Sequence, residues 1–554
     1  MTAETERTPL VRPKASAHGF PTVMPPMRAL VPVCIALWTT TFSASLDGTI
    51  AAMLLGSISA SFRASDQSAW IGSTYLLTVC CVSPLYGRLC DIIGRKRSFV
   101  SAVTLFLGGT CWCACARSMP EFLAARLVTG LGGGGLSTVG SVILSHMVPL
   151  KNRGVFQGLT NIVFGLGTGT GAPLGGWLND TIGWRGAFYV QVPFLTAAVI
   201  LAFMFIYPDE PDESGTPLHI RIARNVDFFG ICIFVAMLLS TLGALSYLEN
   251  GMRPADNPTL YVLGVFAVAF LFSFYFWEAR GARMPVLLMD VFHDRTGGSV
   301  CWNNFFLSFA AFAYSYHFPL YFQTVGGLSA AKIGTRMVPS SILLSTGSFL
   351  AGIYMQKTSR YYWYTVICAA AAVASMLPVL SYDTNPPLVI PFFYNAIISF
   401  SQSGMLTCTL IALINSVVRE HVGVSTGMSY LFRTTGQVLG VAFAGEVLQL
   451  SLKNELRTRI SGPEAEHIID AVLHESTVVP TLPAPLQAEA VQAYAIAMHR
   501  VFIIVTVGYA FSFAAAAMIR NVPLADAPND KQIRSAVNEE GVTHVDEITG
   551  QNNP

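Results

Sequence analysis

Residues 87–97 read GRLCDIIGRKR and lie between two apolar runs, residues 68–89 and 98–117. Each run is long enough for a helix of about 20 residues to cross the hydrocarbon core of a bilayer. Glycines in the connection let two helix ends approach closely, and the carboxylate of Asp91 can dock against a helix end. An ordinary loop on the basic side of a membrane explains the cations, but not the spacing of glycine and aspartate. The stretch predicts a multi-pass membrane protein with a structured connection at this point.

The composition of the whole chain agrees with this prediction. Of its 554 residues, 53% are apolar and only 12% are charged, whereas soluble domains carry about 25% charged residues. The net charge of +1 gives no indication of a nucleic-acid partner. All 11 cysteines lie in or beside apolar runs, which argues against a disulfide framework. No phosphate-binding loop and no metal-ligand spacing occurs, so we expect no enzyme activity, no cofactor and no metal.

Apolar runs of spanning length recur along the chain and predict an all-α integral membrane protein with about fourteen transmembrane helices. The expected spans are 29–54, 68–89, 98–117, 119–146, 154–178, 187–207, 227–248, 258–278, 299–323, 335–356, 361–381, 387–416, 422–449 and 495–519.

Lysine and arginine near the span ends predict the orientation, because basic residues favour the cytosolic side. One side carries fourteen of them: Arg88, Arg95, Lys96, Arg97, Lys151, Arg153, Arg221, Arg224, Arg280, Arg283, Arg295, Lys357, Arg360 and Arg419. The short loops of the other side carry six: Arg63, Arg117, Arg185, Arg253, Lys332 and Arg336. We therefore expect the first side, and with it both chain termini, to be cytosolic.

The polar stretches divide the chain into two six-helix bundles with a helix pair inserted between them. The expected parts are a cytosolic tail (1–28), an N-terminal bundle (29–207), a cytosolic linker (208–226), two inserted helices (227–278), a C-terminal bundle (279–519) with an exofacial loop (450–494), and a polar cytosolic tail (520–554) expected to be disordered.

Two charged residues stand inside predicted spans, where charge is costly and rarely without function. Asp47 lies about seven residues from the outer end of the first span, and Arg126 lies about seven residues into the fourth. At 1.5 Å per residue both sit roughly 10 Å below the outer surface, so an ion pair between them is feasible. Such a pair can serve proton exchange, or it can be structural only.

The fifth span, residues 154–178, contains a run of small residues around one proline. Its core reads Gly171-Ala172-Pro173-Leu174-Gly175-Gly176, preceded by Gly165, Gly167 and Gly169. Small residues with one proline make a bendable, closely packed helix. The alternative interpretation is a packing helix without any directional role in transport.

These segments resemble the motifs of the major facilitator superfamily. Residues 87–97 resemble its signature loop, which in the family is thought to stabilise one access state; its residues here are Gly87, Arg88, Asp91, Gly94, Arg95 and Lys96. Arg126 resembles the arginine of the family's helix-4 motif, which is associated with proton coupling. The resemblance implies the major facilitator fold of two six-helix bundles, here with two extra helices.

Further segments resemble the fourteen-helix drug:proton antiporter branch of that superfamily. Residues 46–49, Leu-Asp-Gly-Thr, look like its Leu-Asp-x-Thr signature, and 184–193, 319–323 and 432–440 also resemble it. The glycine run is similar to the Gly-Pro-x-x-Gly-Gly antiporter motif, with Ala172 intruding before the proline. Its matching residues are Gly167, Gly171, Pro173, Gly175 and Gly176. The resemblance assigns proton coupling to Asp47 and Arg126.

Arg433, near the middle of the span 422–449, and Gln402 are further polar candidates for lining a cavity. Fixed acidic groups at mid-depth are few, while aromatic and small residues dominate residues 299–416. This balance favours a bulky amphiphile over a basic amino acid as substrate.

Three functions remain open. The first is a plasma-membrane antiporter that exports drugs or secondary metabolites against protons. The second is a vacuolar transporter of basic amino acids, because residues 45–97 and 151–158 also look like fungal proteins of that kind. The third is a non-transporting sensor, against which the intact Asp47, Arg126 and Asp91 argue. The expected partners are a small-molecule substrate, protons and the bilayer, with a monomer as the working unit.

Overall fold

The computed structural model describes residues 26–64, 68–206, 226–249, 258–282, 285–382, 389–418, 421–461, 465–474 and 476–524. Within these residues the chain is helical and contains no strand. Most of the two predicted tails and of the linker 208–226 lies outside the described residues. The assignment of these parts, and the division of the chain into two bundles, stay predictions.

The helices of the first half are α1 (Met27–Met53), α2 (Leu55–Ser61), α3 (Ser68–Ile93), α4 (Arg95–Cys115), α5 (Met119–Met147), α6 (Leu150–Ile182), α7 (Trp184–Tyr189) and α8 (Gln191–Phe205). They are followed by α10 (Phe228–Glu249) and α11 (Pro258–Phe276), which continues into a π-helical turn (Trp277–Gly281).

The helices of the second half are α12 (Met289–His293), α13 (Arg295–Thr324), α14 (Ala330–Thr358), α15 (Tyr362–Met376), α16 (Ile390–Ser416), α17 (Val422–Arg459), α18 (Ala465–His474) and α19 (Ala484–Met518). Short 3₁₀ turns follow α15 (Pro378–Ser381) and α18 (Ser476–Thr481).

Each of the fourteen expected spans falls on a helix or a consecutive helix pair. Eleven helical segments are long and apolar enough to cross a membrane, judged by length and composition among the described residues. The helices α6, α13 and α17 are equally long but carry more glycine and polar residues. Helices of this length satisfy their own backbone hydrogen bonds, as a membrane requires. The prediction of an all-α membrane fold is confirmed.

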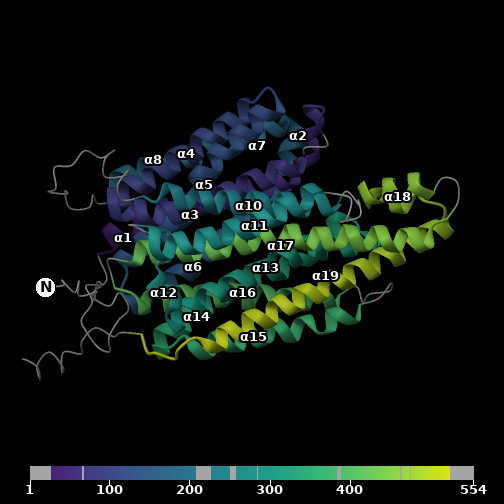
Figure 1. Ribbon diagram of the computed structural model, residues 1–554. Coiled ribbons are helices and arrows are strands. Elements are labelled where there is room, and N and C mark those ends of the chain that lie inside the picture. Colours follow the sequence, from purple (N-terminus) through teal and green to yellow (C-terminus); the bar gives the residue numbers. More distant parts are fainter. Residues whose placement is uncertain are drawn as a thin grey trace, which may run out of the picture.

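Helices of each half pack on one another, and the halves meet along two seams. Within the first half α1 packs on α6 and α8, and α5 on α3 and α4; within the second, α13 packs on α17 and α19, and α14 on α16. The seams between the halves are α3 with α17 and α6 with α14. Figure 1 shows the first half (purple to blue) above the second (green to yellow), with α10 and α11 along the boundary in this view.

The inserted pair lies outside this core. Helix α10 packs on α3 and α17, where it contributes Ile233, Phe234 and Leu238 to a shared apolar cluster. Helix α11 packs mainly on α10, and only 6% of its most apolar window is buried. A helix that is apolar and unburied within the protein needs lipid around it. The pair therefore forms a lipid-facing flank of the transporter.

The stretch 450–494, expected as an exofacial loop, is largely helical. Helix α17 continues to Arg459, α18 and a 3₁₀ turn follow, and α19 already begins at Ala484. Near the ends of the expected spans, Glu455 forms ion pairs with Arg459 (3.6 Å) and Arg500 (2.8 Å), and Arg459 reaches Glu489 (3.2 Å). Hydropathy ended the expected spans too early, because a helix continues where charged side chains pair outside the membrane.

Candidate functional site

Asp47 and Arg126 form an ion pair inside the first half. Arg126 Nη1 lies 2.7 Å from Asp47 Oδ2, and the two side chains are 1% and 0% exposed. Asp47 is six residues from the end of α1, and Arg126 is seven residues from the start of α5. The structure thus brings together two residues that the sequence placed at equal depth.

The third partner of the pair, Tyr75 on α3, was missed by the sequence analysis. The guanidinium carbon of Arg126 lies 4.6 Å from the centroid of the Tyr75 ring, and Arg126 Nε donates to the carbonyl of Ile71 at 3.3 Å. A cation over an aromatic face is stabilised by the ring quadrupole, more so where water is excluded. Tyr75 is seven residues from the start of α3, so it lies at the same depth as Asp47 and Arg126. This equal depth was the feature of the sequence from which Tyr75 could have been predicted as a partner.

The carboxylate of Asp47 is only half satisfied. Its Oδ2 accepts from Arg126, while Oδ1 is buried and has no hydrogen-bond partner among the residues described. Buried polar atoms are normally paired, and exceptions need an explanation. A free oxygen on a buried carboxylate can accept a proton, which would remove the charge that holds Arg126.

The glycines of α6 press against α1 on both sides of Asp47. A Cβ built on Gly167 would collide with Ser45 Oγ, and one built on Gly171 would collide with Thr49 Oγ1. A Cβ on Gly175 would lie 3.3 Å from Ile50 Cγ1, and one on Gly176 would lie 3.7 Å from Met53 Cε. Pro173 lies within the same uninterrupted helix. The predicted antiporter run therefore sets the position of the helix that carries Asp47.

This contact yields a prediction for two glycines of α6 that are two residues apart. Gly171→Ala should reduce transport about tenfold or more, because the added methyl overlaps Thr49 and must displace α1 together with Asp47. Gly169→Ala is the matched control, since nothing lies within 4 Å of a Cβ there. Transport by the two purified variants in liposomes is the measurement. Equal activity of both variants would contradict a positioning role for the run.

The signature residues join α3 to α17 at the end that we assign to the cytosol. A Cβ on Gly87 would lie 2.6 Å from the carbonyl oxygen of Gly423, and one on Gly423 would lie 2.6 Å from Asp91 Oδ1. Gly423 is the second residue of α17, so Asp91 lies at the amino end of that helix. A carboxylate there is favoured by the helix dipole.

The remaining signature residues tie this junction to neighbouring segments. Arg88 Nε donates to the carbonyl of Pro285 at 3.2 Å, in the segment before α12. Gly94 alone separates α3 from α4 and has a φ of 86°, which favours glycine. Lys96 Nζ lies 5.0 Å from the centroid of the Phe203 ring on α8, and Arg95 lies in the first turn of α4.

The second seam, between α6 and α14, closes the same side. A Cβ on Gly154 would lie 2.6 Å from Met355 Cε, and one on Gly158 would lie 2.7 Å from the Cα of Phe349. Farther along α6, Asn161 donates to Ser348 Oγ at 2.7 Å and to Thr407 Oγ1 at 3.3 Å. Both seams are tight in the predicted cytosolic half, so the two halves are held together there.

The two predicted cavity residues lie on separate helices of the second half. Arg433 is partly buried on α17, and its guanidinium carbon lies 5.6 Å from the centroid of the Tyr430 ring. Gln402 is partly buried on α16. No hydrogen bond within the described part of the chain joins them, and their role in lining a cavity stays a prediction.

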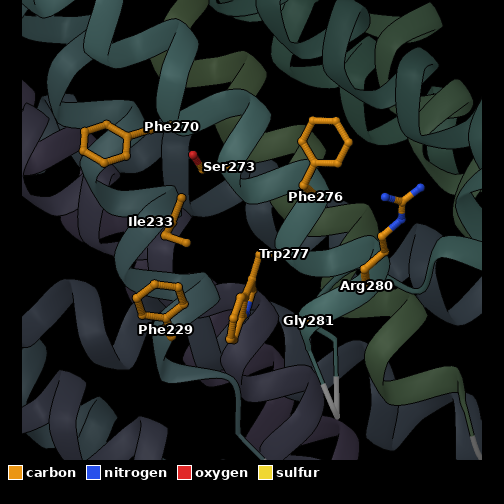
Figure 2. Close-up of a pocket in the computed structure, with 8 residues that line it drawn as sticks. All are labelled: Phe229, Ile233, Phe270, Ser273, Phe276, Trp277, Arg280 and Gly281. Carbon is orange, nitrogen blue, oxygen red and sulfur yellow. The ribbon is translucent and has the colours of Figure 1, made fainter.

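A groove of about 580 Å³ lies between α10 and α11, away from all candidate residues (Figure 2). Phe229, Phe270, Phe276 and Trp277 line it, with Arg280 at its edge. Trp277 Nε1 donates to Asp227 Oδ2 at 2.7 Å. Because this groove opens on the lipid-facing flank, we do not assign it to the substrate.

Comparison with known proteins decides the family. The family model described as the Major Facilitator Superfamily matches residues 37–441. The chain belongs to this superfamily. As a major facilitator it is a multi-pass membrane transporter and not an enzyme, and the resemblance inferred from its motifs is confirmed.

Two curated relatives of this facilitator come from Schizosaccharomyces pombe. "Multidrug resistance protein fnx1" is 34% identical over 85% of this chain and 89% of its own length. "Vacuolar membrane amino acid uptake transporter fnx2" is 30% identical over 86% of this chain and 82% of its own length. The two names describe different substrates and leave the membrane open.

A solved structure supports the same fold for this facilitator. The human organic anion transporter MFSD10 (TETRAN) is 15% identical, with 88% of this chain and 100% of that chain covered and a TM-score of 0.55. At this identity the likeness concerns the fold alone.

Proposed function

We propose that this facilitator is a proton-coupled antiporter that exports a drug or an amphiphilic secondary metabolite from the cytosol. The observation that carries the proposal is the buried pair of Asp47 and Arg126, in which one oxygen of the carboxylate has no hydrogen-bond partner among the described residues. A charge pair that is fully withdrawn from water is costly, and charged residues inside membrane spans usually serve a function. The absence of a nucleotide-binding loop from the sequence supports a gradient as the energy source.

The proton step follows from the contacts of the pair. When Asp47 binds a proton, the attraction between it and Arg126 is lost, and the guanidinium keeps the Tyr75 ring and the Ile71 carbonyl. Helix α1 carries Asp47 and packs on the glycines of α6, and α6 also forms a seam with α14. A change in the ion pair can therefore shift α6 relative to α14. Protonation can thereby favour one arrangement of the two halves over the other.

The export direction is supported by where the pair and the seams lie. Asp47 and Arg126 lie in the predicted outer half of the first bundle, and the seams hold the predicted cytosolic ends together. A proton from the outer side therefore has the shorter path to Asp47. The proposed working unit is a monomer.

A second candidate is a vacuolar transporter that moves basic amino acids out of the cytosol. The observation that favours it is the relative named as a vacuolar amino acid transporter, at 30% identity over most of both chains. The aromatic residues of the second half support an amphiphilic substrate less strongly than the sequence suggested. Tyr314, Phe318, Tyr321 and Phe322 are buried in the core of the second half.

Uptake into liposomes under an imposed proton gradient tests the proposal. The purified protein should take up a hydrophobic dye substrate saturably and release protons in exchange, and lysine should not compete. Saturable, pH-driven uptake of lysine or arginine without competition from hydrophobic compounds would decide for the vacuolar candidate. Plasma-membrane localisation of a tagged copy in its own cell is the expected companion result.

A further inference from the structure

Arg433 places a positive charge at mid-depth in the second half. It follows the first residue of α17, Val422, by eleven positions, which corresponds to roughly 16 Å along the helix from the predicted cytosolic end. At the same level of the molecule, Cys80 Sγ on α3 lies 3.3 Å from Thr435 Oγ1 on α17. Arg433 is therefore as far from both membrane surfaces as the span allows.

The neighbours of Arg433 on α17 show which way it faces. Ser429 accepts a hydrogen bond from Asn304 on α13 at 2.8 Å, and Gly436 packs on Phe305 of the same helix. Tyr430 hydrogen-bonds instead to Ser141 on α5, in the other half, at 2.9 Å. With 3.6 residues per turn, Arg433 lies about 60° from Gly436 and about 60° from Tyr430, between the two directions. It points to the junction of the halves and not to lipid.

Within the residues that the structure describes, the charge of Arg433 has no carboxylate partner. The contact that defines its place is the Tyr430 ring at 5.6 Å. Asp47 is already bound to Arg126, so that pair contributes no net charge. Glu446, the next acidic residue along α17, is thirteen positions away, or roughly 20 Å along the helix. The junction between the halves thus carries an excess of one positive charge at mid-depth.

We propose that Arg433 binds a carboxylate, or another anionic group, of the transported molecule. The inference rests on the proposed transport function and names the chemical class of its substrate. A guanidinium binds carboxylates through two parallel hydrogen bonds, and an unbalanced charge in the membrane is costly until such a partner arrives. Gln437, one turn farther on the same face and 8% exposed, offers an amide beside it. A substrate that carries only positive charge would be repelled at this position.

Liposomes with an imposed pH gradient and a cytosolic small-molecule extract test the inference. Compounds that accumulate in liposomes with protein, and not in empty ones, are identified by mass spectrometry. Each accumulated acid is then offered beside its own amide, which keeps the shape and lacks the charge. The wild-type protein is compared with Arg433→Gln, with Arg433→Lys, and with Arg457→Gln, an arginine that is 49% exposed outside the membrane.

We expect the accumulated compounds to carry an anionic group and the wild type to prefer each acid over its amide by roughly tenfold or more. Arg433→Gln should remove this preference, Arg433→Lys should retain part of it, and Arg457→Gln should not change it. Equal uptake of acid and amide, or a preference unchanged in Arg433→Gln or lost equally in Arg433→Lys, would overturn the inference and leave transport standing. No accumulation of any compound would instead overturn the proposed function, and the inference with it.

Discussion

Asp47→Asn is expected to abolish proton-driven exchange while the protein still folds and inserts into the membrane. Asparagine keeps an oxygen that can accept the hydrogen bond from Arg126 Nη1, now 2.7 Å from Asp47 Oδ2, and it has nearly the same volume. It cannot bind and release a proton, so the variant loses the titrating group that the proposal requires. The measurement is substrate-coupled proton flux in liposomes across a range of external pH.

The matched control is Asp180→Asn, because Asp180 is exposed near the carboxyl end of α6, on the predicted outer side. Its exchange rate and pH dependence should equal those of the wild type. If Asp47→Asn exchanges substrate for protons with an unchanged pH dependence, the buried pair is structural and the proposed role of Asp47 is wrong.

Arg126→Ala should be at least as damaging as Asp47→Asn, and it should also destabilise the protein. Its removal leaves the Asp47 carboxylate, which is fully buried, without any partner, and breaking a buried ion pair in this way costs about 3–5 kcal/mol. The Tyr75 ring and the Ile71 carbonyl lose their partner as well. Thermal unfolding of the detergent-purified protein measures the loss of stability, and liposome transport measures the loss of function.

Arg457→Ala supplies the comparison for stability. Arg457 and its partner Glu466 are 49% and 68% exposed and lie 3.3 Å apart, and exposed pairs of this kind contribute about 0–1 kcal/mol. A double variant, Asp47→Asn with Arg126→Ala, removes both charges and should recover part of the lost stability without recovering exchange. Similar unfolding temperatures for Arg126→Ala and Arg457→Ala would contradict the expected contribution of the buried pair to stability.

The all-α membrane fold and the places of the long apolar helices followed from the sequence alone. Apolar length is a local property, and a bilayer imposes it on each helix separately. The same local logic marked Asp47 and Arg126, since a charge in an apolar run stands out without knowledge of its neighbours. The ends of the helices were harder to predict from the sequence, and α17 continues to Arg459, beyond its expected end. The reason is that backbone hydrogen bonding, and not hydropathy, decides where a helix stops.

Only the tertiary structure decided which helices touch and what the marked residues touch. The glycines of α6 predicted close packing, but their local sequence did not indicate that they would contact α1 at Thr49. Three other placements also depend on residues far away in the chain: Tyr75 over Arg126, Asp91 at the start of α17, and Arg433 between α13 and α5. Helices in a membrane choose partners by the complementary shapes of their surfaces. That shape exists only once all the helices are assembled, and a single segment of sequence does not contain it.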